Sequence, residues 1–322
     1  MDGTRIRAMA IGMGVALLTG ALVAQPALGA EDTAAAETTV AIPSEAYDIP
    51  GVLALPADAV GPVPAVLMLH GYGSTADEVG DMYGRLAESL AAHGIGSLRV
   101  DFAGMGASAA STLDYTYDSM VSDAAAALDW LVGEESTDPE RIGVQGFSMG
   151  SMIGSHLVGT DSRPIAFGSW SGAIDDYNPV TGQAESLEAC EATGEGHLEL
   201  DLGWRTIDHS CEYFSSMMGG TALTDFAPYA GALLLVAGSD DVVVPPSVSE
   251  NAATASASED VTLEIIEGAD HIYHVLTEDQ TLADQAISCL LYTSPSPRDE
   301  QFHLVCRLLL EKRGGGGGGG GG

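Results

Sequence analysis

The sequence predicts an α/β fold with a mostly parallel sheet and helices on both faces. Two observations support this fold class. Short apolar runs alternate with segments of helical periodicity along most of the chain, which is typical of a parallel sheet covered on both sides. The chain also has 322 residues, of which 46% are hydrophobic and 18% charged, so it is able to bury a large core.

The expected elements follow this alternation. Strands are predicted, in chain order, over 64–69, 95–100, 142–146, 165–170, 233–237 and 261–266. Helices are predicted between them, over 82–93 before Gly94, over 121–132 and over 151–158. Thr277 is expected to cap a last helix that has Glu278 and Asp279 in its first turn. Residues 31–40, rich in Ala, Thr and Glu, are predicted to be a loose leader.

One segment interrupts this rhythm. Residues 173–227 are too long for a plain connection between two strands, so we expect them to form an inserted cap. The segment concentrates aromatic residues, and Trp204 and Phe214 are candidates for walling a substrate pocket or for forming the cap's own core. It also holds Cys190 and Cys211, an even pair that predicts one disulfide in an exported protein; two free thiols are the alternative.

Both ends of the chain differ from the body. Residues 1–30 contain Arg5 and Arg7, an apolar run and a small-residue end, which is the pattern of a cleaved export signal. An uncleaved membrane anchor is the alternative, although the apolar run is short for a bilayer span. Residues 289–322 break the composition and end in nine glycines, so we interpret them as a non-native tail that resembles translated sequencing adapter. A native flexible tail is the alternative.

The charge balance excludes several partners. Asp and Glu total 46 against 11 Lys and Arg, a formal net charge of −35. Such a chain has too few cations to bind a nucleic-acid backbone, and an anionic membrane repels it. Residues 31–288 contain 42 acidic residues and five arginines, so the expected domain is even more acidic than the chain as a whole.

The strongest chemical signal is Gly146-Phe-Ser148-Met-Gly150, which lies between a predicted strand and a predicted helix. In that context the G-x-S-x-G pattern makes a tight turn that exposes the serine hydroxyl at a helix N-terminus. A serine needs a general base to become a strong nucleophile. Ser148 is therefore the candidate nucleophile.

The base and its acid are expected at later strand ends. Asp240 and Asp241 follow the strand 233–237, and His271 follows the strand 261–266, with His274 as a competing base. Serine, acid and histidine thus occur in the order typical of this arrangement. The residues themselves do not decide whether Asp240 or Asp241 is the acid.

The backbone offers two candidate donors for an oxyanion. The segment His70-Gly-Tyr72-Gly follows a predicted strand, and the N–H of Tyr72 is one donor. The N–H of Met149, directly after the nucleophile, is the second. The side chain of His70 is expected to brace this loop.

These motifs resemble a serine hydrolase of the α/β-hydrolase fold over about residues 45–288. The branch that they resemble holds feruloyl/cinnamoyl esterases, dienelactone-hydrolase-like proteins and prolyl-oligopeptidase-like peptidases. In that branch the acid stands four residues before the proline of an Asp-x-Val-Val-Pro pattern, and this resemblance favours Asp241, which precedes Pro245. Dienelactone hydrolases proper use cysteine as the nucleophile, so Ser148 argues against that activity.

The resulting expectation is a secreted serine hydrolase that cleaves small-molecule carboxylic esters through Ser148, Asp241 and His271. A serine peptidase (aminopeptidase or dipeptidyl-peptidase-like) on the same fold is the alternative, and a non-catalytic binding protein is a third reading. The histidines have no metal-site spacing, and Gly104 and Gly106 make no dinucleotide fingerprint, so no metal and no cofactor are expected. The oligomeric state is left open.

Overall fold

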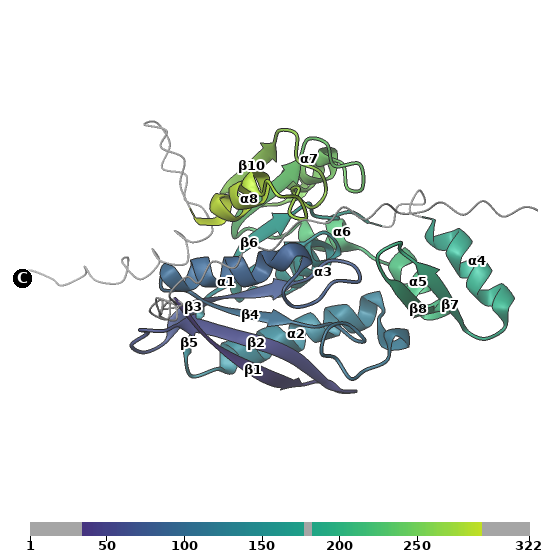
Figure 1. Cartoon of the computed structure of the whole chain (residues 1–322), viewed down its shortest axis with the longest axis horizontal. Helices are drawn as coiled ribbons and strands as arrows, with labels where there is room; N and C mark the ends of the chain where they lie inside the picture. The colour runs from purple at the N-terminus through teal and green to yellow at the C-terminus, as the bar shows by residue number, and fades with distance from the viewer. Residues whose placement is uncertain (1–33, 177–181, 292–322) are drawn as a thin grey trace, which may run out of the picture. The chain divides into compact units, whose positions relative to one another are not determined.

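A computed structural model describes residues 34–176 and 182–291 of the chain. The expected export segment, residues 1–30, and residues 292–322 of the expected tail lie outside the described residues. The described part contains an eight-stranded sheet in the order β1-β2-β4-β3-β5-β6-β9-β10 (Figure 1). These strands are β1 (Ala35–Pro43), β2 (Asp48–Pro56), β3 (Val63–Leu69), β4 (Gly96–Val100), β5 (Thr137–Phe147), β6 (Pro164–Trp170), β9 (Ala232–Gly238) and β10 (Val261–Ile266).

The sheet is parallel except at one edge. β1 pairs antiparallel with β2, and β2 pairs antiparallel with β4, whereas every other neighbouring pair is parallel. The carboxyl ends of β3, β5, β9 and β10 therefore meet at the same edge. The loops that follow these four strands carry all the residues that the sequence predicts for the triad and the oxyanion donors.

Helices cover both faces of the sheet, which confirms the predicted fold class. Along β3, Leu67 and Leu69 contribute to one hydrophobic core, and Val66 and Met68 contribute to the other, because successive strand side chains point to opposite faces. Helices α1 (Met82–Ala92) and α8 (Thr281–Leu291) contribute to the core of Val66 and Met68. Helices α2 (Tyr117–Gly133), α3 (Met149–Thr160) and α7 (Pro246–Ala255) contribute to the other core.

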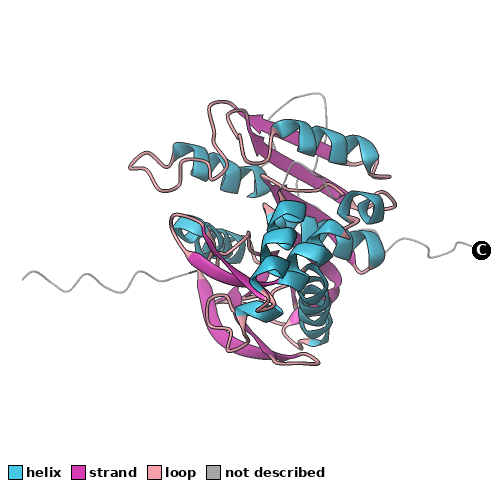
Figure 2. Cartoon of the chain, turned by 90° about the vertical axis from the view of Figure 1, so that its right-hand side faces the viewer, coloured by secondary structure: helices cyan, strands magenta, loops and turns pink. Residues whose placement is uncertain are grey.

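The chain between β6 and β9 forms the inserted cap. It contains α4 (Gln183–Thr193), the hairpin strands β7 (His197–Asp201) and β8 (Thr206–Ser210), and the short helices α5 (Cys211–Met218) and α6 (Ala222–Phe226). Figure 1 shows α4, α5 and the hairpin to the right of the sheet, and Figure 2 turns this side towards the viewer. Cys190 on α4 and Cys211 on α5 form a disulfide whose Cα atoms are 5.6 Å apart.

Two expectations about single elements are wrong. Residues 35–40, expected to be part of a loose leader, instead belong to β1 (Ala35–Pro43), because their backbone finds a pairing partner in β2 that the local composition does not reveal. Thr277 does not cap the last helix, which begins at Thr281. Its hydroxyl instead donates to the carbonyls of His274 and Asp279, and the Asp279 carboxylate accepts from the N–H of Thr281.

Helix α8 passes the position where the composition changes and continues to Leu291, with Leu290 and Leu291 buried. Two short 3-10 turns, Val79–Asp81 and Thr112–Asp114, complete the described elements. None of the helices described over 34–176 and 182–291 has the length and apolar character needed to cross a membrane.

The disulfide provides a first prediction. Its Cys residues are 21 positions apart, so the bond restricts the unfolded chain and is expected to add about 3 kcal/mol to the free energy of unfolding. Alkylation of the denatured, non-reduced protein followed by peptide mass spectrometry should leave Cys190 and Cys211 unmodified and modify Cys289, which is a free thiol. Alkylation at both cap cysteines without reductant would contradict the prediction.

A buried carboxyl group on α2 provides a second prediction. Asp123 is 2% exposed, it accepts a 2.8 Å hydrogen bond from the hydroxyl of Tyr47, and burial raises its pKa from 3.8 to about 6. The folded protein therefore binds this proton more tightly than the unfolded chain does. Stability from this group is complete below about pH 4 and is lost as the pH rises through about 6.

Asp123→Asn removes this titration and keeps an oxygen that accepts from Tyr47. Between pH 4 and pH 8 we expect the wild type to lose about 1–3 kcal/mol of unfolding free energy relative to this variant, measured by urea denaturation. Asp118→Asn, at an exposed position of the same helix, is the control. Its unfolding free energy should change between pH 4 and pH 8 by the same amount as that of the wild type. A difference between wild type and Asp123→Asn that is the same at both pH values would refute the assignment.

Candidate active site

Ser148 lies in a strained turn between β5 and α3. Its backbone has φ 51° and ψ −115°, a sparsely populated region for a residue with a side chain. The turn requires the two flanking glycines. A Cβ on Gly150 would lie 1.9 Å from the carbonyl oxygen of Leu69, and a Cβ on Gly146 would lie 2.4 Å from the Cα of Ser151. Only glycine fits at either position, which is the physical reason for the G-x-S-x-G pattern.

The structure brings Ser148, His271 and Asp241 together in one chain of contacts. Nε2 of His271 lies 3.0 Å from Oγ of Ser148, and Nδ1 lies 2.8 Å from Oδ2 of Asp241. The Asp241 side chain is 0% exposed and that of His271 is 17% exposed. One ring nitrogen thus faces the hydroxyl and the other faces a buried carboxylate, an arrangement able to move a proton from serine to histidine.

Of the two candidate acids, Asp241 contacts the histidine. Its Oδ1 accepts hydrogen bonds from the N–H groups of Val243 and Val244, at 2.9 and 2.8 Å, which leaves Oδ2 directed at His271. Asp240 is exposed, and its carboxylate accepts from the hydroxyl of Ser239. The turn after β9 therefore holds the two neighbouring carboxylates in different environments.

Of the two candidate bases, His271 contacts the serine. The hydroxyl of Ser171 donates to the carbonyl of His271 at 2.9 Å, which ties the histidine loop to the end of β6. His274 lies elsewhere in the same loop. Its Nε2 is 3.9 Å from a carboxylate oxygen of Asp270, and its side chain is more exposed than that of His271.

The two predicted oxyanion donors lie next to this chain of contacts. Tyr72 and Met149 line the same cavity as Ser148. Met149 is the first residue of α3, so its N–H is among those that the helix cannot satisfy internally. Within the described residues no acceptor binds the N–H of Tyr72. Both N–H groups are thus available to a negatively charged oxygen.

The peptide that carries the N–H of Tyr72 is held through its carbonyl. The carbonyl oxygen of Gly71 lies 2.7 Å from Nδ1 of His70 and accepts from the N–H of Ser74 at 3.1 Å. The N–H of Gly71 donates to the carboxylate of Glu78 at 2.6 Å. We call residues 70–74 the oxyanion loop. Its first half is therefore anchored by His70 and Glu78 to the part of the fold outside the cap.

The His70 side chain is wholly buried, and burial lowers its pKa, so the ring is neutral near pH 7. Its Nε2 accepts from the N–H of Phe102 at 3.2 Å, which requires the proton on Nδ1, where it faces the Gly71 carbonyl. The expected bracing role of His70 thus has a geometric basis. Glu78 was not singled out from the sequence, because nothing in its local pattern indicates that its carboxylate reaches back to Gly71.

A cavity of about 470 Å³ opens in front of Ser148. Its apolar walls come from the cap, α3 and the loop after β9, and they include Phe214, Tyr213, Met152, Met217 and Val244. Trp204, the other candidate for the pocket wall, does not line it. It lies in the turn of the cap hairpin, 65% exposed, near Gly73. The two cap aromatics thus differ in position because one lies on a buried helix face and the other at a hairpin tip.

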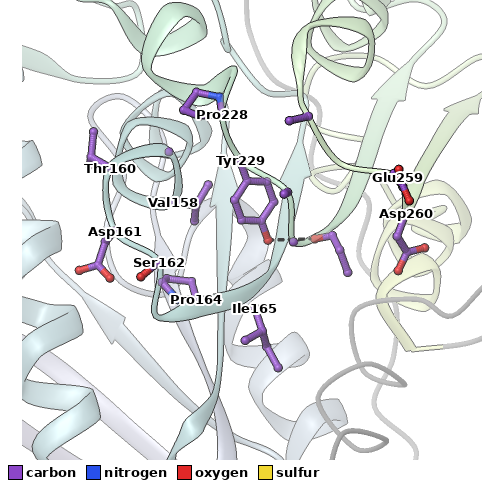
Figure 3. A pocket seen from close by; sticks show the side chains of 15 residues that line it. Val158, Thr160, Asp161, Ser162, Pro164, Ile165, Pro228, Tyr229, Glu259 and Asp260 are labelled. Atoms are coloured by element: carbon purple, nitrogen blue, oxygen red, sulfur yellow. Dashed lines mark hydrogen bonds between the residues drawn. The ribbon is translucent and has the colours of Figure 1, made fainter.

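A second, larger cavity of about 830 Å³ lies at the amino-terminal ends of β6, β9 and β10, and Figure 3 shows the side chains that line it. It is lined by the first residues of β6 and β9, by the segments that precede β6, β9 and β10, and by the end of α3. The Asp161 carboxylate is paired with Arg163, and the Tyr229 hydroxyl donates to the Ala232 carbonyl. No histidine or cysteine is among the residues that line it. Across 34–176 and 182–291, no group of three or more His, Cys, Asp or Glu is placed to hold a metal ion.

The structure also brings to the oxyanion loop two cap residues that sequence reasoning passed over. Arg205 donates to the carbonyl of Gly73 at 2.9 Å, and Nε2 of His209 lies 2.6 Å from the hydroxyl of Tyr72. No local signal in the sequence indicates either contact, because the partners are more than 130 residues apart.

Comparison with known proteins identifies a family that this chain matches. The profile described as "Alpha/beta hydrolase family" matches residues 66–285. A protein of Mycobacterium tuberculosis (strain ATCC 25618 / H37Rv), Rv2307c, itself uncharacterized, is 29% identical over 229 residues, which is 70% of this chain and 68% of the relative.

Solved structures share the fold. Est1E from Butyrivibrio proteoclasticus with ferulic acid bound has a TM-score of 0.62 and 19% identity, covering 77% of this chain and 96% of its own. The alpha/beta hydrolase GrgF from Penicillium sp. sh18 has a TM-score of 0.63 and 19% identity, covering 79% and 97%. Since the family profile covers more than half of the chain, the protein belongs to the alpha/beta hydrolase family.

Proposed function

We propose that this protein is a serine hydrolase that cleaves carboxylic esters through an acyl-enzyme. The observation that carries the proposal is the contact chain from Ser148 Oγ through the His271 ring to the buried carboxylate of Asp241. Ester hydrolysis is within reach of such a contact chain, because it needs an activated nucleophile and a stabilised oxyanion. Structural relatives of the same fold include an esterase domain from Rhodothermus marinus.

In the proposed mechanism Ser148 attacks the ester carbonyl while His271 Nε2 accepts its proton. Asp241 keeps the proton of the resting ring on Nδ1 and stabilises the imidazolium that forms. The N–H groups of Tyr72 and Met149 bind the oxyanion of the tetrahedral intermediate. His271 then protonates the departing alcohol, and a water molecule activated by the same ring hydrolyses the acyl-enzyme.

The proposed substrates are neutral, moderately apolar small-molecule esters. The cavity walls are mainly Leu, Val, Met, Phe and Tyr side chains, which favour apolar acyl or alcohol groups. The net charge of −35 repels anionic molecules on approach. The export pattern of residues 1–30 and the cap disulfide support a location outside the cytoplasm, where disulfides persist.

One observation bears on the peptidase alternative. Asp175 and Asp176 lie in the cavity lining, where a carboxylate would suit the free amine of a peptide. The Asp176 carboxylate, however, accepts from both the N–H and the hydroxyl of Thr224, and Oδ1 of Asp175 accepts from the N–H of Asp176. Both carboxylate oxygens of Asp176 and one oxygen of Asp175 thus already accept hydrogen bonds within the protein, which weakens this pair as an anchor for a free amine and supports ester over amine-anchored substrates.

The triad assignment generates a third prediction. Ser148→Ala and His271→Ala should each lower kcat for p-nitrophenyl butyrate by at least about 10³-fold, because the members of a triad act as a unit. Asp241→Asn should lower kcat by about 10²- to 10⁴-fold, since the amide no longer holds the ring in the required tautomer.

Asp240→Asn and His274→Ala are the matched controls and should keep kcat within about threefold of wild type, since neither side chain contacts the triad. Steady-state kinetics with circular dichroism to verify folding decide the point. An Asp240→Asn variant more damaged than Asp241→Asn would overturn the acid assignment. Parallel assays with aminoacyl anilides would expose a peptidase.

The charge argument generates a fourth prediction. At low ionic strength kcat/KM should be higher for a neutral p-nitrophenyl ester than for an analogue that bears a free carboxylate on the acyl chain. Raising NaCl from 20 mM to 1 M should narrow this gap, because salt screens the repulsion. A ratio that does not respond to salt would show that the pocket, not the field of the protein, sets the preference.

A further inference from the structure

The hairpin of β7 and β8 lies against the second half of the oxyanion loop. Arg205, between the two strands, donates from Nη1 to the carbonyl of Gly73 at 2.9 Å. Side chains of the hairpin also close over Gly73, since a Cβ there would lie 2.9 Å from Cδ1 of Ile207 and 3.0 Å from the ring of Trp204. Arg205 is the only lysine or arginine between residues 164 and 297. The single lysine or arginine of the cap thus contacts the oxyanion loop.

A second polar contact joins the hairpin to Tyr72 itself. The hydroxyl of Tyr72 and Nε2 of His209, on β8, are 2.6 Å apart and share a hydrogen bond. The two rings are also stacked, with centroids 5.6 Å apart and planes inclined by 19°. The ring of Tyr213 stacks in turn on the ring of His209, with their centroids 4.1 Å apart. The side chain of the residue that supplies the oxyanion donor is thus held by the cap.

Stability alone does not account for a histidine at this position. Burial lowers the pKa of His209 to about 4 and raises that of Tyr72 to about 12, so both groups are neutral near pH 7. The His209 ring is buried, and within the described residues its Nδ1 has no hydrogen-bond partner. An unpartnered buried group costs about 1–3 kcal/mol, which an apolar side chain in this aromatic cluster would avoid.

The backbone on either side of Tyr72 explains why such a contact matters. Tyr72 lies between Gly71 and Gly73, and Gly73 has a positive φ of 65°. Glycines leave the backbone freer than other residues do, so the orientation of the Tyr72 N–H needs external restraint. His70 and Glu78 restrain the Gly71 side from the hydrolase body. His209 and Arg205 restrain the other side from the cap.

We propose that the β7–β8 hairpin positions the oxyanion donor of Tyr72, with His209 and Arg205 as positioning residues that act through the Tyr72 side chain and the Gly73 carbonyl. This inference rests on the proposed hydrolase function. It gives the cap a role beyond walling the cavity, because a change in the hairpin alters the stabilisation of the transition state as well as the fit of the substrate.

Three variants test the link. Tyr72→Phe removes the hydroxyl and keeps the stacked ring, His209→Leu removes the partner, and His209→Gln keeps a side chain able to hydrogen-bond. Loss of a whole oxyanion donor typically lowers kcat by about 10²- to 10³-fold, so a donor that is only misplaced should lower it by about 5- to 30-fold. KM for p-nitrophenyl butyrate should stay within about twofold. His209→Gln should recover much of the lost kcat.

His197→Leu is the matched control. His197 lies on β7 of the same hairpin and pairs with Asp208 at 2.7 Å, away from the oxyanion loop. It should leave kcat unchanged. His209→Leu should melt close to wild type, because it removes the unpartnered Nδ1 but also the partner of the Tyr72 hydroxyl. A loss of kcat in His197→Leu equal to that in His209→Leu, or unchanged kcat in both Tyr72→Phe and His209→Leu, would overturn the proposal.

The rate at which a fluorophosphonate labels Ser148 separates this inference from the proposed function, since phosphonylation develops charge on the same oxygen position without requiring an ester substrate. Labelled wild type with no ester turnover would contradict the ester proposal, and the labelling ratios of the variants would still decide the positioning role. Tyr72→Phe and His209→Leu should be labelled about 5- to 30-fold more slowly than wild type and His197→Leu. A wild type that the probe does not label at Ser148 would overturn both.

Discussion

The geometry of the candidate site depends on one close approach, where α3 begins directly beneath the end of β3. The carbonyl of Leu69 lies where a Cβ of residue 150 would be, and the start of α3 crowds position 146 in the same way. Two glycines let the helix start this close to the strand. The approach forces Ser148 to a positive φ and places the first N–H of α3 beside the loop that follows β3. The nucleophile Ser148 and the candidate oxyanion donors Tyr72 and Met149 therefore lie together where the ends of β3 and β5 meet the start of α3.

Acidic residues supply much of the internal bracing in this acidic chain. Glu78 holds the N–H of Gly71, Asp101 accepts from the N–H groups of Ala76 and Ala107, and Asp241 accepts from two N–H groups of its own turn. A carboxylate that accepts backbone hydrogen bonds stays partly buried without a cationic partner. A protein with few cations is thus able to keep charged loops ordered around the carboxyl ends of its strands.

The cap and the hydrolase body meet at an aromatic cluster and not at a plain apolar wall. Tyr72 and Tyr115 belong to the body, and His209 and Tyr213 belong to the cap, yet their rings are stacked with nearly parallel planes. Phe214 extends this cluster into the cavity. One group of rings therefore joins the core of the cap, the wall of the pocket and the side chain of the candidate oxyanion residue. The choice between a cap core and a pocket wall, posed from the sequence, does not apply to these residues.

The sequence by itself determined the fold class, the order of most strands and helices, and the elbow at Ser148, because periodicity and the glycine spacing are local properties. It also narrowed the acid to two neighbours. Tertiary structure decided what depends on distant contacts. Residues 35–43 are a strand only because β2 lies beside them. Asp241 differs from Asp240 by facing a histidine 30 residues away, and His209 reaches Tyr72 across 137 residues. Such contacts depend on how the elements pack. For the acid, a resemblance of Asp241-Val-Val-Val-Pro245 to a family pattern favoured one neighbour, whereas the local sequence around His209 and Tyr72 gives no indication of their contact.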